Sequence, residues 1–556
     1  MLAPSKVINN SNPRECQQTG KLNMITEWTP IEVAEFIIDE GWDSAATPVR
    51  WNVSAGDSIS VHISGMSNES QQVAMLALGA WTSVTGIEFT FVNSASAAQL
   101  DFSDTSGGPV GGWSSSGGYI ISGFVHVDQS WINTYGSGIG DYGFQTYIHE
   151  IGHALGIAHP GHYESGGTTY ETHAEFLNDS WQMTVMSYFS QTQNTYIDAT
   201  RAFVVTPMIA DIHAAQLLYG DSNTIRTGNT TYGENGNAGN YYDDIIDASG
   251  PVTFTIIDDG GIDTLRLINT AADQYIDMRG GGISDVYGLV GNMVIYTDTV
   301  IENLYLGRGN DTVTGNEADN YIRANTGYDT IYSLEGNDTI YAQDGHDAVY
   351  AGDGDDIIFG GSGADIADGG DGDDIIETAA GGDEIYGGAG NDYLNGNSRS
   401  DSIYGGTGND TLWGEGGRDD IRGGHDDDTI YGGNGADILD GELGNNTIYG
   451  GSGRDVLYGG SGDDIIYGGA GGRDQYFGGS GADEFIYQVG DNNDQIYDFQ
   501  NDIDLLDLSD FSVGNVWDYA TEIDGDVVFN FGNRDILTVE FITIAELSDD
   551  VLIASP

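Results

Sequence analysis

Lysine and arginine are scarce in this chain. Its 556 residues hold 16 Lys and Arg against 87 Asp and Glu, which gives a formal net charge of −71. Such a surface repels the phosphates of nucleic acids and is disfavoured at an anionic membrane. We therefore expect no nucleic-acid partner. So many carboxylates need counter-ions, and their placement in the sequence indicates which ones.

Cysteine is almost absent as well, because Cys16 is the only one. An intramolecular disulfide is therefore excluded, and something else must stiffen the long repetitive part of the chain. No apolar run approaches the roughly 18 residues that span a bilayer, so we predict no integral membrane span. The first 25 residues also lack the apolar core of a secretory signal peptide. Taken alone, these absences indicate a cytosolic protein, but the repeats point elsewhere.

His149, Glu150, His153, Gly156 and His159 stand in one string, HEIGHALGIAH. Residues four apart share one face of a helix, so His149 and His153 can direct imidazole nitrogens at the same metal ion. Gly156 can adopt the left-handed conformation that ends a helix, and this turn brings His159 round as a third ligand. Three protein ligands leave a fourth position open for water, which is typical of a catalytic zinc ion. The Glu150 carboxylate can take a proton from that water.

The full string HEIGHALGIAH is a far more specific signal than the HExxH motif alone. HExxH arises by chance in roughly one chain in a hundred of this length, and fixing the glycine and the third histidine lowers this to on the order of one in a hundred thousand. The alternative reading, a helix with stray surface histidines, is therefore disfavoured.

Around this string, the hydrophobic pattern predicts an α/β domain over residues 26–220. The last predicted helix has Thr206 as N-cap, Pro207 in its first position and Gly220 at its end. One segment, 117–132, is predicted to form a strand pair or an edge strand beside the cleft that holds the metal site. The predicted helices are 28–42, 71–86, 143–156 and 206–220, and the predicted strands lie in 50–64, 87–93 and 117–132.

A repeat of nine residues follows. From Asp311 to Asp464, sixteen of eighteen positions spaced nine apart are Asp, the exceptions being Asn320 and Asn446, and an apolar residue stands two positions after each step. This Gly-rich nonapeptide is typical of a calcium-binding parallel β-roll. A flexible Gly/Asp linker, the alternative, has no reason to keep an apolar residue at every ninth position. The predicted calcium ligands are Asp338, Asp347, Asp356, Asp365, Asp374, Asp383, Asp392, Asp410, Asp437, Asp455, Asp464 and Asp483.

The β-roll pattern predicts a switch. Without calcium, rows of Asp one turn apart repel one another, and ordering so many glycines is entropically costly. Calcium binding would contribute directly to the free energy of folding. We therefore expect the roll to be unfolded at cytosolic calcium levels and folded at the millimolar levels found outside the cell.

Together these motifs resemble the serralysins, secreted bacterial zinc proteases of the metzincin group that carry C-terminal calcium-binding (RTX) repeats. The resemblance rests on HEIGHALGIAHPGHY, VMSYF, TPMIADIHAAQLLYG, IENLYLGRGNDTVTGN and the repeat array. It implies a multidomain chain with a metzincin-like α/β catalytic domain that cleaves protein or peptide substrates, with Glu150 as general base and acid. It also implies export by type I secretion machinery through an uncleaved C-terminal signal, and a monomer outside the cell.

The same resemblance gives roles to two residues of TVMSYF. Met186 would form the Met turn, a hydrophobic floor under the three imidazoles, although a lone methionine is more often simple core packing. Tyr188 would be an additional zinc ligand that swings away to hydrogen-bond the transition state.

The expected domains are a propeptide-like leader (1–25), the catalytic domain (26–220), a β-rich junction (221–300), the β-roll (301–490) and a β-rich cap with the secretion signal (491–556). Some residues depart from the serralysin pattern. His162 stands where an acidic residue is expected, and the chain ends in IASP rather than in a hydrophobic cluster. Arg399 and Asp426 replace glycines, so calcium sites near them are predicted to be weak or absent.

Cys16 stands in the leader in the context PREC, similar to the cysteine that holds zinc inactive in matrix metalloproteinase zymogens. A thiolate is a good zinc ligand, so Cys16 is a candidate inhibitory ligand. The alternative is an incidental thiol in a disposable leader.

Two functions compete at this point. The leading one is a secreted zinc-dependent endopeptidase that calcium folds and stabilises. The other is a calcium-stiffened extracellular adhesin or surface-binding protein whose metzincin-like domain does not cleave. The three histidines, the glutamate, the methionine and the tyrosine are all present, which favours the enzyme.

Overall fold

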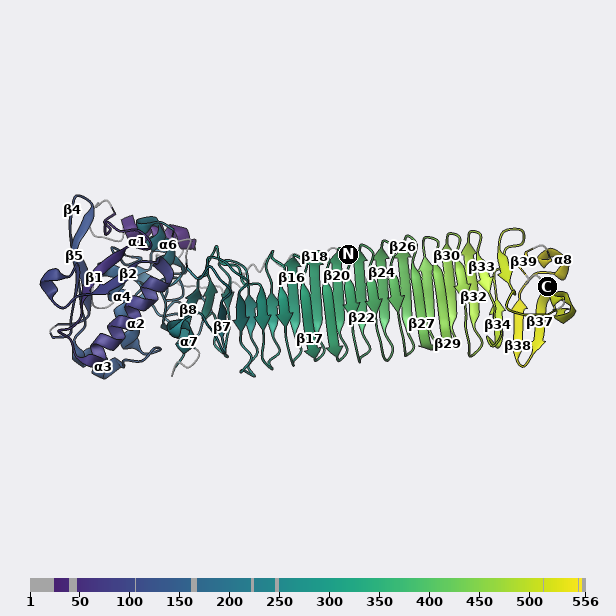
Figure 1. Ribbon diagram of the computed structural model, residues 1–556. Coiled ribbons are helices and arrows are strands. Elements are labelled where there is room, and N and C mark those ends of the chain that lie inside the picture. The colour runs from purple at the N-terminus through teal and green to yellow at the C-terminus, as the bar shows by residue number, and fades with distance from the viewer. Residues whose placement is uncertain are drawn as a thin grey trace. The chain divides into compact units, whose positions relative to one another are not determined.

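The computed structural model describes residues 25–39, 48–105, 107–161, 168–221, 225–245, 250–513, 515–548 and 550–552 (Figure 1). Cys16, His162 and the final residues 553–556 lie outside these ranges. The chain divides into two compact units. The first comprises Met1–Ile225, Asp247–Thr255 and Val290–Asn292, and the second comprises Arg226–Ile246, Ile256–Leu289 and Met293–Pro556.

The first unit contains a five-stranded sheet in the order β2-β1-β3-β5-β4. Its strands run parallel except β4, an edge strand that pairs antiparallel with β5. Segment 117–132 therefore supplies β5 and the start of a helix, and the neighbouring β4 forms the edge. Ile59 and Val61 of β1 are fully buried, as the alternating pattern predicts. The strands of this sheet are β1 (Ser58–His62), β2 (Glu88–Phe91), β3 (Leu100–Ser103), β4 (Val110–Ser116) and β5 (Tyr119–His126). Two strands outside this sheet are β6 (Phe203–Val204) and β8 (Val252–Ile256).

The four predicted helices are confirmed, with shifted ends. Ser67 caps the second helix through its hydroxyl, and Gly86 ends it at φ 67°. The predicted start of the last helix at Thr206 is wrong, because the cap is Met208, whose N–H donates to the Asp211 carboxylate. Its end at Gly220 is confirmed. The helices are α1 (Pro30–Asp39), α2 (Asn68–Thr85), the 3₁₀ turn η2 (Ala95–Ala97), α3 (Gln129–Tyr135), α4 (Tyr142–Ala154), α5 (Tyr170–His173) and α6 (Ile209–Tyr219).

The second unit is a parallel β-solenoid, which confirms the predicted β-roll (Figure 1). Strands of two sheets alternate along the chain. From β13 to β29, each strand pairs with the strand one coil, or 18 residues, later, as Val349 does with Ala367. Its strands are β7 (Thr231–Gly233), β9 (Thr264–Arg266), β10 (Tyr275–Asp277), β13 (Asn303–Tyr305), β14 (Thr312–Thr314), β15 (Tyr321–Arg323), β16 (Thr330–Glu335), β17 (Thr339–Asp344), β18 (Ala348–Asp353), β19 (Ile357–Ser362), β20 (Ile366–Asp371), β21 (Ile375–Glu377), β22 (Glu384–Ala389), β23 (Tyr393–Asn395), β24 (Ser402–Thr407), β25 (Thr411–Trp413), β26 (Asp420–His425), β27 (Thr429–Gly435), β28 (Ile438–Glu442), β29 (Thr447–Gly453), β30 (Val456–Ser461), β31 (Ile465–Tyr467), β32 (Gln475–Ser480) and β33 (Glu484–Ile486).

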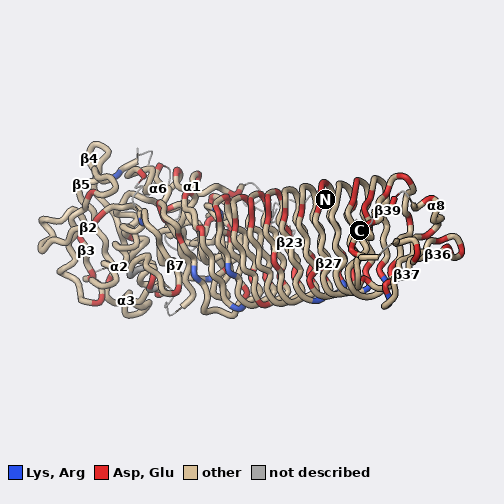
Figure 2. The backbone as a smooth tube through the Cα atoms, turned by 45° about the vertical axis from the view of Figure 1, so that its right-hand side comes forward, with Lys and Arg blue, Asp and Glu red and all other residues tan. Residues whose placement is uncertain are grey.

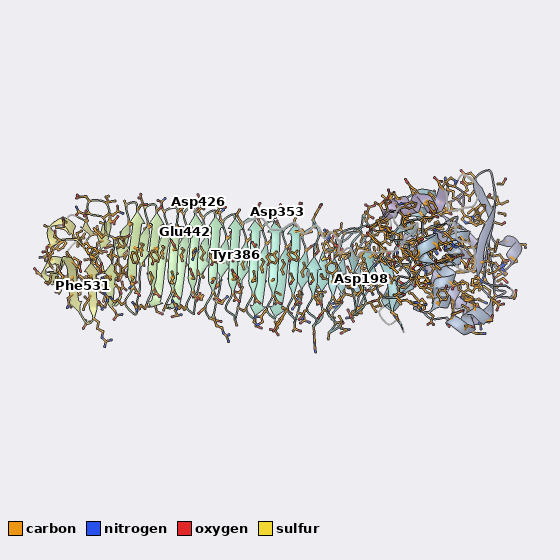
Figure 3. All side chains as sticks on the ribbon, turned by 180° about the vertical axis from the view of Figure 1, so that it is seen from behind. Asp198, Asp353, Tyr386, Asp426, Glu442 and Phe531 are labelled. Carbon is orange, nitrogen blue, oxygen red and sulfur yellow. The ribbon has the colours of Figure 1, made fainter. Side chains whose placement is uncertain are left out.

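The repeat explains this coil. The apolar residue two positions after each Asp points inward and is fully buried, as Ile331, Ile403 and Ile466 show. Arg399 and Asp426, which replace glycines, still take the left-handed conformation at φ 82° and 75°. Asp426 lies at the edge of the roll in Figure 3. The coil therefore continues through these degenerate repeats.

Antiparallel strands end the second unit, in agreement with the predicted β-rich cap: β37 pairs antiparallel with both β36 and β38. The cap elements are β34 (Asn493–Ile496), β35 (Leu505–Asp507), η3 (Val516–Tyr519), β36 (Ala520–Ile523), β37 (Asp526–Gly532), β38 (Asp535–Val539), α8 (Ile544–Leu547) and β39 (Val551–Leu552). Before the roll, the unit also contains α7 (Asn240–Ile245) and the hairpin of β11 (Ile283–Ser284) and β12 (Met293–Ile295). Within the described residues, none of the helices combines the length and apolar character needed to span a bilayer.

Candidate metal centre

Helix α4 carries the first two histidines of the motif, and a glycine turn delivers the third. Gly156 adopts φ 94°, and a Cβ atom there would stand 2.3 Å from the carbonyl oxygen of Val49. The N–H of Ile157 donates to the carbonyl of Gly152, which closes the turn. Only glycine satisfies both the left-handed conformation and this close approach. The chain then runs back so that His159 faces the helix.

The three imidazoles converge on one point. His153 Nε2 lies 3.1 Å from His159 Nε2, which in turn lies 3.2 Å from His149 Nε2. His149 Nδ1 is 2.9 Å from the carbonyl oxygen of Val185, and His153 Nδ1 is 2.9 Å from that of Ile157. These carbonyls place the ring protons of His149 and His153 on Nδ1, which leaves each Nε2 lone pair facing the centre.

The electrostatics keep the three rings neutral, the form in which histidine binds a metal. Burial lowers the pKa of His149. Burial, with the neighbouring His149, lowers the pKa of His153 to about 3. Burial, with the other two rings, also lowers the pKa of His159.

The donor set fits zinc. Two ligands at the usual Zn–N distance of about 2.0–2.1 Å in a tetrahedron stand roughly 3.3 Å apart. The ring nitrogens are separated by 3.1 and 3.2 Å. Three neutral nitrogens this close cannot all hydrogen-bond one another, whereas one cation satisfies all three lone pairs.

Glu150 lies beside the triad in an apolar environment. Only 7% of the residue is exposed, and this burial raises the pKa of its carboxyl to about 7. A hydrogen bond from the backbone of Gly111 acts in the opposite direction and lowers that pKa. Edge strand β4 passes close to the helix here, because a Cβ atom on Gly111 would stand 2.0 Å from the Glu150 carbonyl oxygen. A carboxyl with this pKa can both accept and return a proton near neutral pH.

Met186 lies under the helix. It is fully buried, and a Cβ atom on Gly152 would stand 2.7 Å from its sulfur, so Gly152 leaves the space that Met186 fills. Asp211, a buried residue whose role the sequence did not reveal, fixes the turn that carries Met186. Its carboxylate accepts hydrogen bonds from the Thr184 hydroxyl and from the N–H groups of Val185 and Met208. The signal was the one acidic residue of helix α6.

Tyr188 stands at the open side of the triad. Its ring centroid lies 4.4 Å from that of His159 and 6.2 Å from that of His149, and 39% of the residue is exposed. Burial, with the Glu150 carboxylate adding to it, raises the pKa of the Tyr188 hydroxyl, so it stays protonated. The structure thus brings together the three histidines, Glu150, Met186 and Tyr188.

The predicted calcium ligands share a second geometry. In each of the twelve, Oδ1 accepts a hydrogen bond from the backbone N–H of the residue one coil earlier, as Asp374 does from Asp356 at 2.8 Å and Asp392 does from Asp374 at 2.9 Å. The other oxygen, Oδ2, is buried and has no hydrogen-bond partner. In eight of the twelve, Oδ2 faces the glycine five residues earlier: a Cβ atom on Gly369 would stand 2.1 Å from Asp374 Oδ2. Buried orphan oxygens in rows fit a hard cation such as calcium.

Six further aspartates of the repeat have the same buried Oδ2 without a hydrogen-bond partner, and they are not among the predicted ligands. Five of them stand at the same nine-residue step, and the sixth, Asp474, stands one residue beyond it because one residue is inserted at Gly472. The step of nine could therefore have identified them in the sequence. Figure 2 shows acidic residues recurring along the roll. The six are Asp311, Asp329, Asp401, Asp419, Asp428 and Asp474.

Two protein-family models match this chain. The family described as "Peptidase M10 serralysin C terminal" matches residues 221–553, and the family described as "Metallo-peptidase family M12B Reprolysin-like" matches residues 118–213. Metallopeptidase AprA of Pseudomonas marginalis is 35% identical over 274 residues, which cover 47% of this chain and 57% of that protein. Serralysin of Photorhabdus luminescens is 34% identical over 286 residues, covering 48% and 57%.

Serralysin of Proteus mirabilis is 42% identical over 185 residues, which cover 33% of this chain and 38% of that protein. The chain thus spans little more than half the length of the first two relatives. A solved structure of the AlgE6R3 subunit of the Azotobacter vinelandii mannuronan C5-epimerase matches 24% of this chain at 24% identity and a TM-score of 0.17, which is too low to support an argument.

Proposed function

This chain belongs to the peptidase M10 serralysin family, and from that premise we propose that it is a secreted zinc-dependent endopeptidase that hydrolyses peptide bonds in proteins. The observation that carries the proposal is the convergence of three neutral imidazole nitrogens, 3.1 and 3.2 Å apart, beside a buried carboxyl. No observation favours the adhesin, which needs neither feature.

His149, His153 and His159 would hold the zinc ion. When bound, zinc supplies Lewis acidity, which polarises the scissile carbonyl and makes a water molecule easier to deprotonate. Glu150 takes the proton from the attacking water and returns it to the amide nitrogen as the C–N bond breaks.

Tyr188 is placed to donate its O–H to the oxyanion that forms on the scissile carbonyl. It remains a donor because burial raises its pKa. Its membership of the ligand set in the resting enzyme is part of the same proposal. Met186 and Asp211 act indirectly: Met186 supports the helix beneath the triad, and the Asp211 carboxylate fixes the turn that carries both Met186 and Tyr188.

Calcium ions would bind along the roll through the orphan Oδ2 atoms and neighbouring backbone carbonyls. Ordering the coil without cations leaves these buried carboxylates uncompensated, so calcium binding and folding are coupled. This coupling suits a chain that is exported unfolded by type I secretion machinery and folds as a monomer outside the cell. Residues 26–220 would then form the catalytic domain and residues 491–556 the cap and export signal.

Casein zymography of wild type, Glu150→Ala and Glu150→Gln, in calcium, tests the activity. Wild type should clear casein and lose this activity in phenanthroline, because the chelator removes zinc. Both variants should be inactive while retaining zinc, since Glu150 is not one of the three ligands. Clearing by Glu150→Ala at the wild-type rate would contradict the proposed role of Glu150, and no clearing by zinc-loaded wild type would contradict the function.

A further inference from the structure

Five aromatic side chains, Trp131, Tyr135, Tyr142, Trp181 and Phe203, form one cluster, here called the aromatic wall. Tyr142 lies at its centre. Its ring centroid is 6.1 Å from that of Trp131, 5.5 Å from that of Tyr135, 5.9 Å from that of Trp181 and 5.7 Å from that of Phe203. The rings come from α3, α4, the segment before Met186 and β6.

The aromatic wall is fixed to helix α4. The Trp131 indole N–H donates to the Thr146 hydroxyl at 3.1 Å, and the N–H of Val204 donates to the Gln145 side chain. A Cβ atom on Gly143 would stand 2.1 Å from the carbonyl oxygen of Gly136, so the end of α3 presses directly against the start of α4. The cluster is therefore a rigid surface.

The wall adjoins the metal centre at two points. Tyr142 stands seven residues before His149 on the same helix, which is two turns along one face. The Trp181 indole N–H donates to the carbonyl of Ser187, the residue between Met186 and Tyr188. Burial raises the pKa of Tyr142, and the Glu150 carboxylate adds to that rise, as expected for nearby groups.

The rings are open to solvent to different degrees. Trp181 is 6% exposed, Tyr135 is 42% exposed, and Trp131, Tyr142 and Phe203 lie between buried and exposed. An apolar surface beside the catalytic groups can bury a substrate side chain. Discrimination by such a surface rises with the apolar area of that side chain.

Arg201 stands at the rim of the wall. Its guanidinium carbon lies 5.8 Å from the ring centroid of Phe203, and the residue is exposed. Residues 26–220 hold 20 Asp and Glu but only two cations, Arg50 and Arg201. Arg50 is engaged, since its guanidinium donates to the Leu218 carbonyl. Within the described ranges no carboxylate forms an ion pair with Arg201, so its charge is available to a ligand.

We propose that the aromatic wall and Arg201 form a substrate subsite that takes a large apolar side chain next to an acidic residue, at one fixed position relative to the scissile bond. The subsite deepens the proposed function and rests on it. The strongly acidic surface would otherwise repel acidic segments, and Arg201 reverses this locally.

The test uses the full chain loaded with zinc and calcium. Mass spectrometry of a digested peptide library first determines where the bonds are cleaved. One set of peptides then differs only by Phe or Ala at the preferred apolar position. A second set differs only by Glu, Gln or Lys at the preferred acidic position. Wild type should favour Phe over Ala at least tenfold in kcat/KM. It should favour Glu over Gln about threefold, as expected for an exposed ion pair.

Variants separate the two parts of the subsite. Tyr135→Ala should reduce the preference for Phe, whereas Tyr196→Ala, an exposed tyrosine outside the wall, should leave it unchanged. Arg201→Glu should invert the preference between Glu and Lys, and Arg201→Gln should bring the ratio of Glu to Gln close to one. Unaltered ratios in the Arg201 variants, or no positional preference in wild type, would overturn the subsite. If wild type cleaves no peptide at all, the proposed function fails instead.

Discussion

The stability of the calcium-free roll should fall as pH rises, which is unusual for a chain rich in carboxylates. Asp374, Asp401 and Asp428 carry the largest shifts among the roll carboxylates. In each, burial first, and then neighbouring Asp charges, raises the pKa from 3.8 to about 8. A raised pKa means that the folded roll holds protons which the unfolded chain has released. Its contribution to stability is therefore complete below about pH 4 and is lost as pH rises through about 8.

The size of the effect follows from the number of protons. Each proton held only by the folded state changes the free energy of unfolding by about 1.4 kcal/mol per pH unit. Between pH 6 and 7 the three aspartates together give at most about 4 kcal/mol, and solvent screening lowers this figure. Calcium replaces these protons, so a calcium-loaded roll should lose this dependence.

Urea unfolding followed by circular dichroism, on full-length protein made calcium-free with a chelating resin, measures this at pH 5, 6, 7 and 8. Where the calcium-free roll is folded, its urea midpoint should fall as pH rises, until near neutral pH the roll is unfolded without urea. Millimolar calcium should abolish this trend. Asp374→Asn should raise the pH at which the calcium-free roll unfolds, and it should weaken calcium binding. The neighbouring Asp373→Asn is the control, because Asp373 is exposed and its pKa is lowered by hydrogen bonds to Asn391. A calcium-free midpoint that rises from pH 6 to 8, or equal effects of the two variants, would refute the reasoning.

Two further predictions concern the first unit. Gly152→Ala should lower the free energy of unfolding by about 1–3 kcal/mol and reduce activity, because the new Cβ would meet the Met186 sulfur at 2.7 Å. Gly79→Ala is its control: Gly79 lies in α2 with nothing within 4 Å of its added Cβ, so thermal unfolding should show a small gain. Cys16→Ser should leave the casein-cleavage rate of the full-length chain unchanged if the thiol is incidental, and a rise in that rate would identify Cys16 as an inhibitory zinc ligand.

Much of this architecture could be predicted because its signals are local and periodic. Spacing of four on a helix, a glycine at its end and a step of nine along the roll each repeat within a few residues of sequence. The converging imidazoles and the buried columns of the roll follow from those periods. At the degenerate repeats, Arg399 and Asp426 adopt the left-handed turn without glycine. The weak or absent calcium sites expected near them remain a prediction.

Contacts between distant segments could not be predicted in this way. Nothing near Asp211 in the sequence shows that its carboxylate binds the turn at Val185, 26 residues earlier. Gly111 and Gly152 are ordinary glycines in the sequence, yet one admits strand β4 beside Glu150 and the other admits Met186. Each depends on tertiary packing, which leaves no period in the chain.

Metal analysis of the purified, calcium-loaded protein tests the central claim most directly. We expect one zinc ion per chain in wild type and in Glu150→Gln, and a loss of zinc in His153→Ala, which removes one of the three converging nitrogens. Wild-type protein that contains no transition metal, or His153→Ala that keeps its zinc undiminished, would contradict the account.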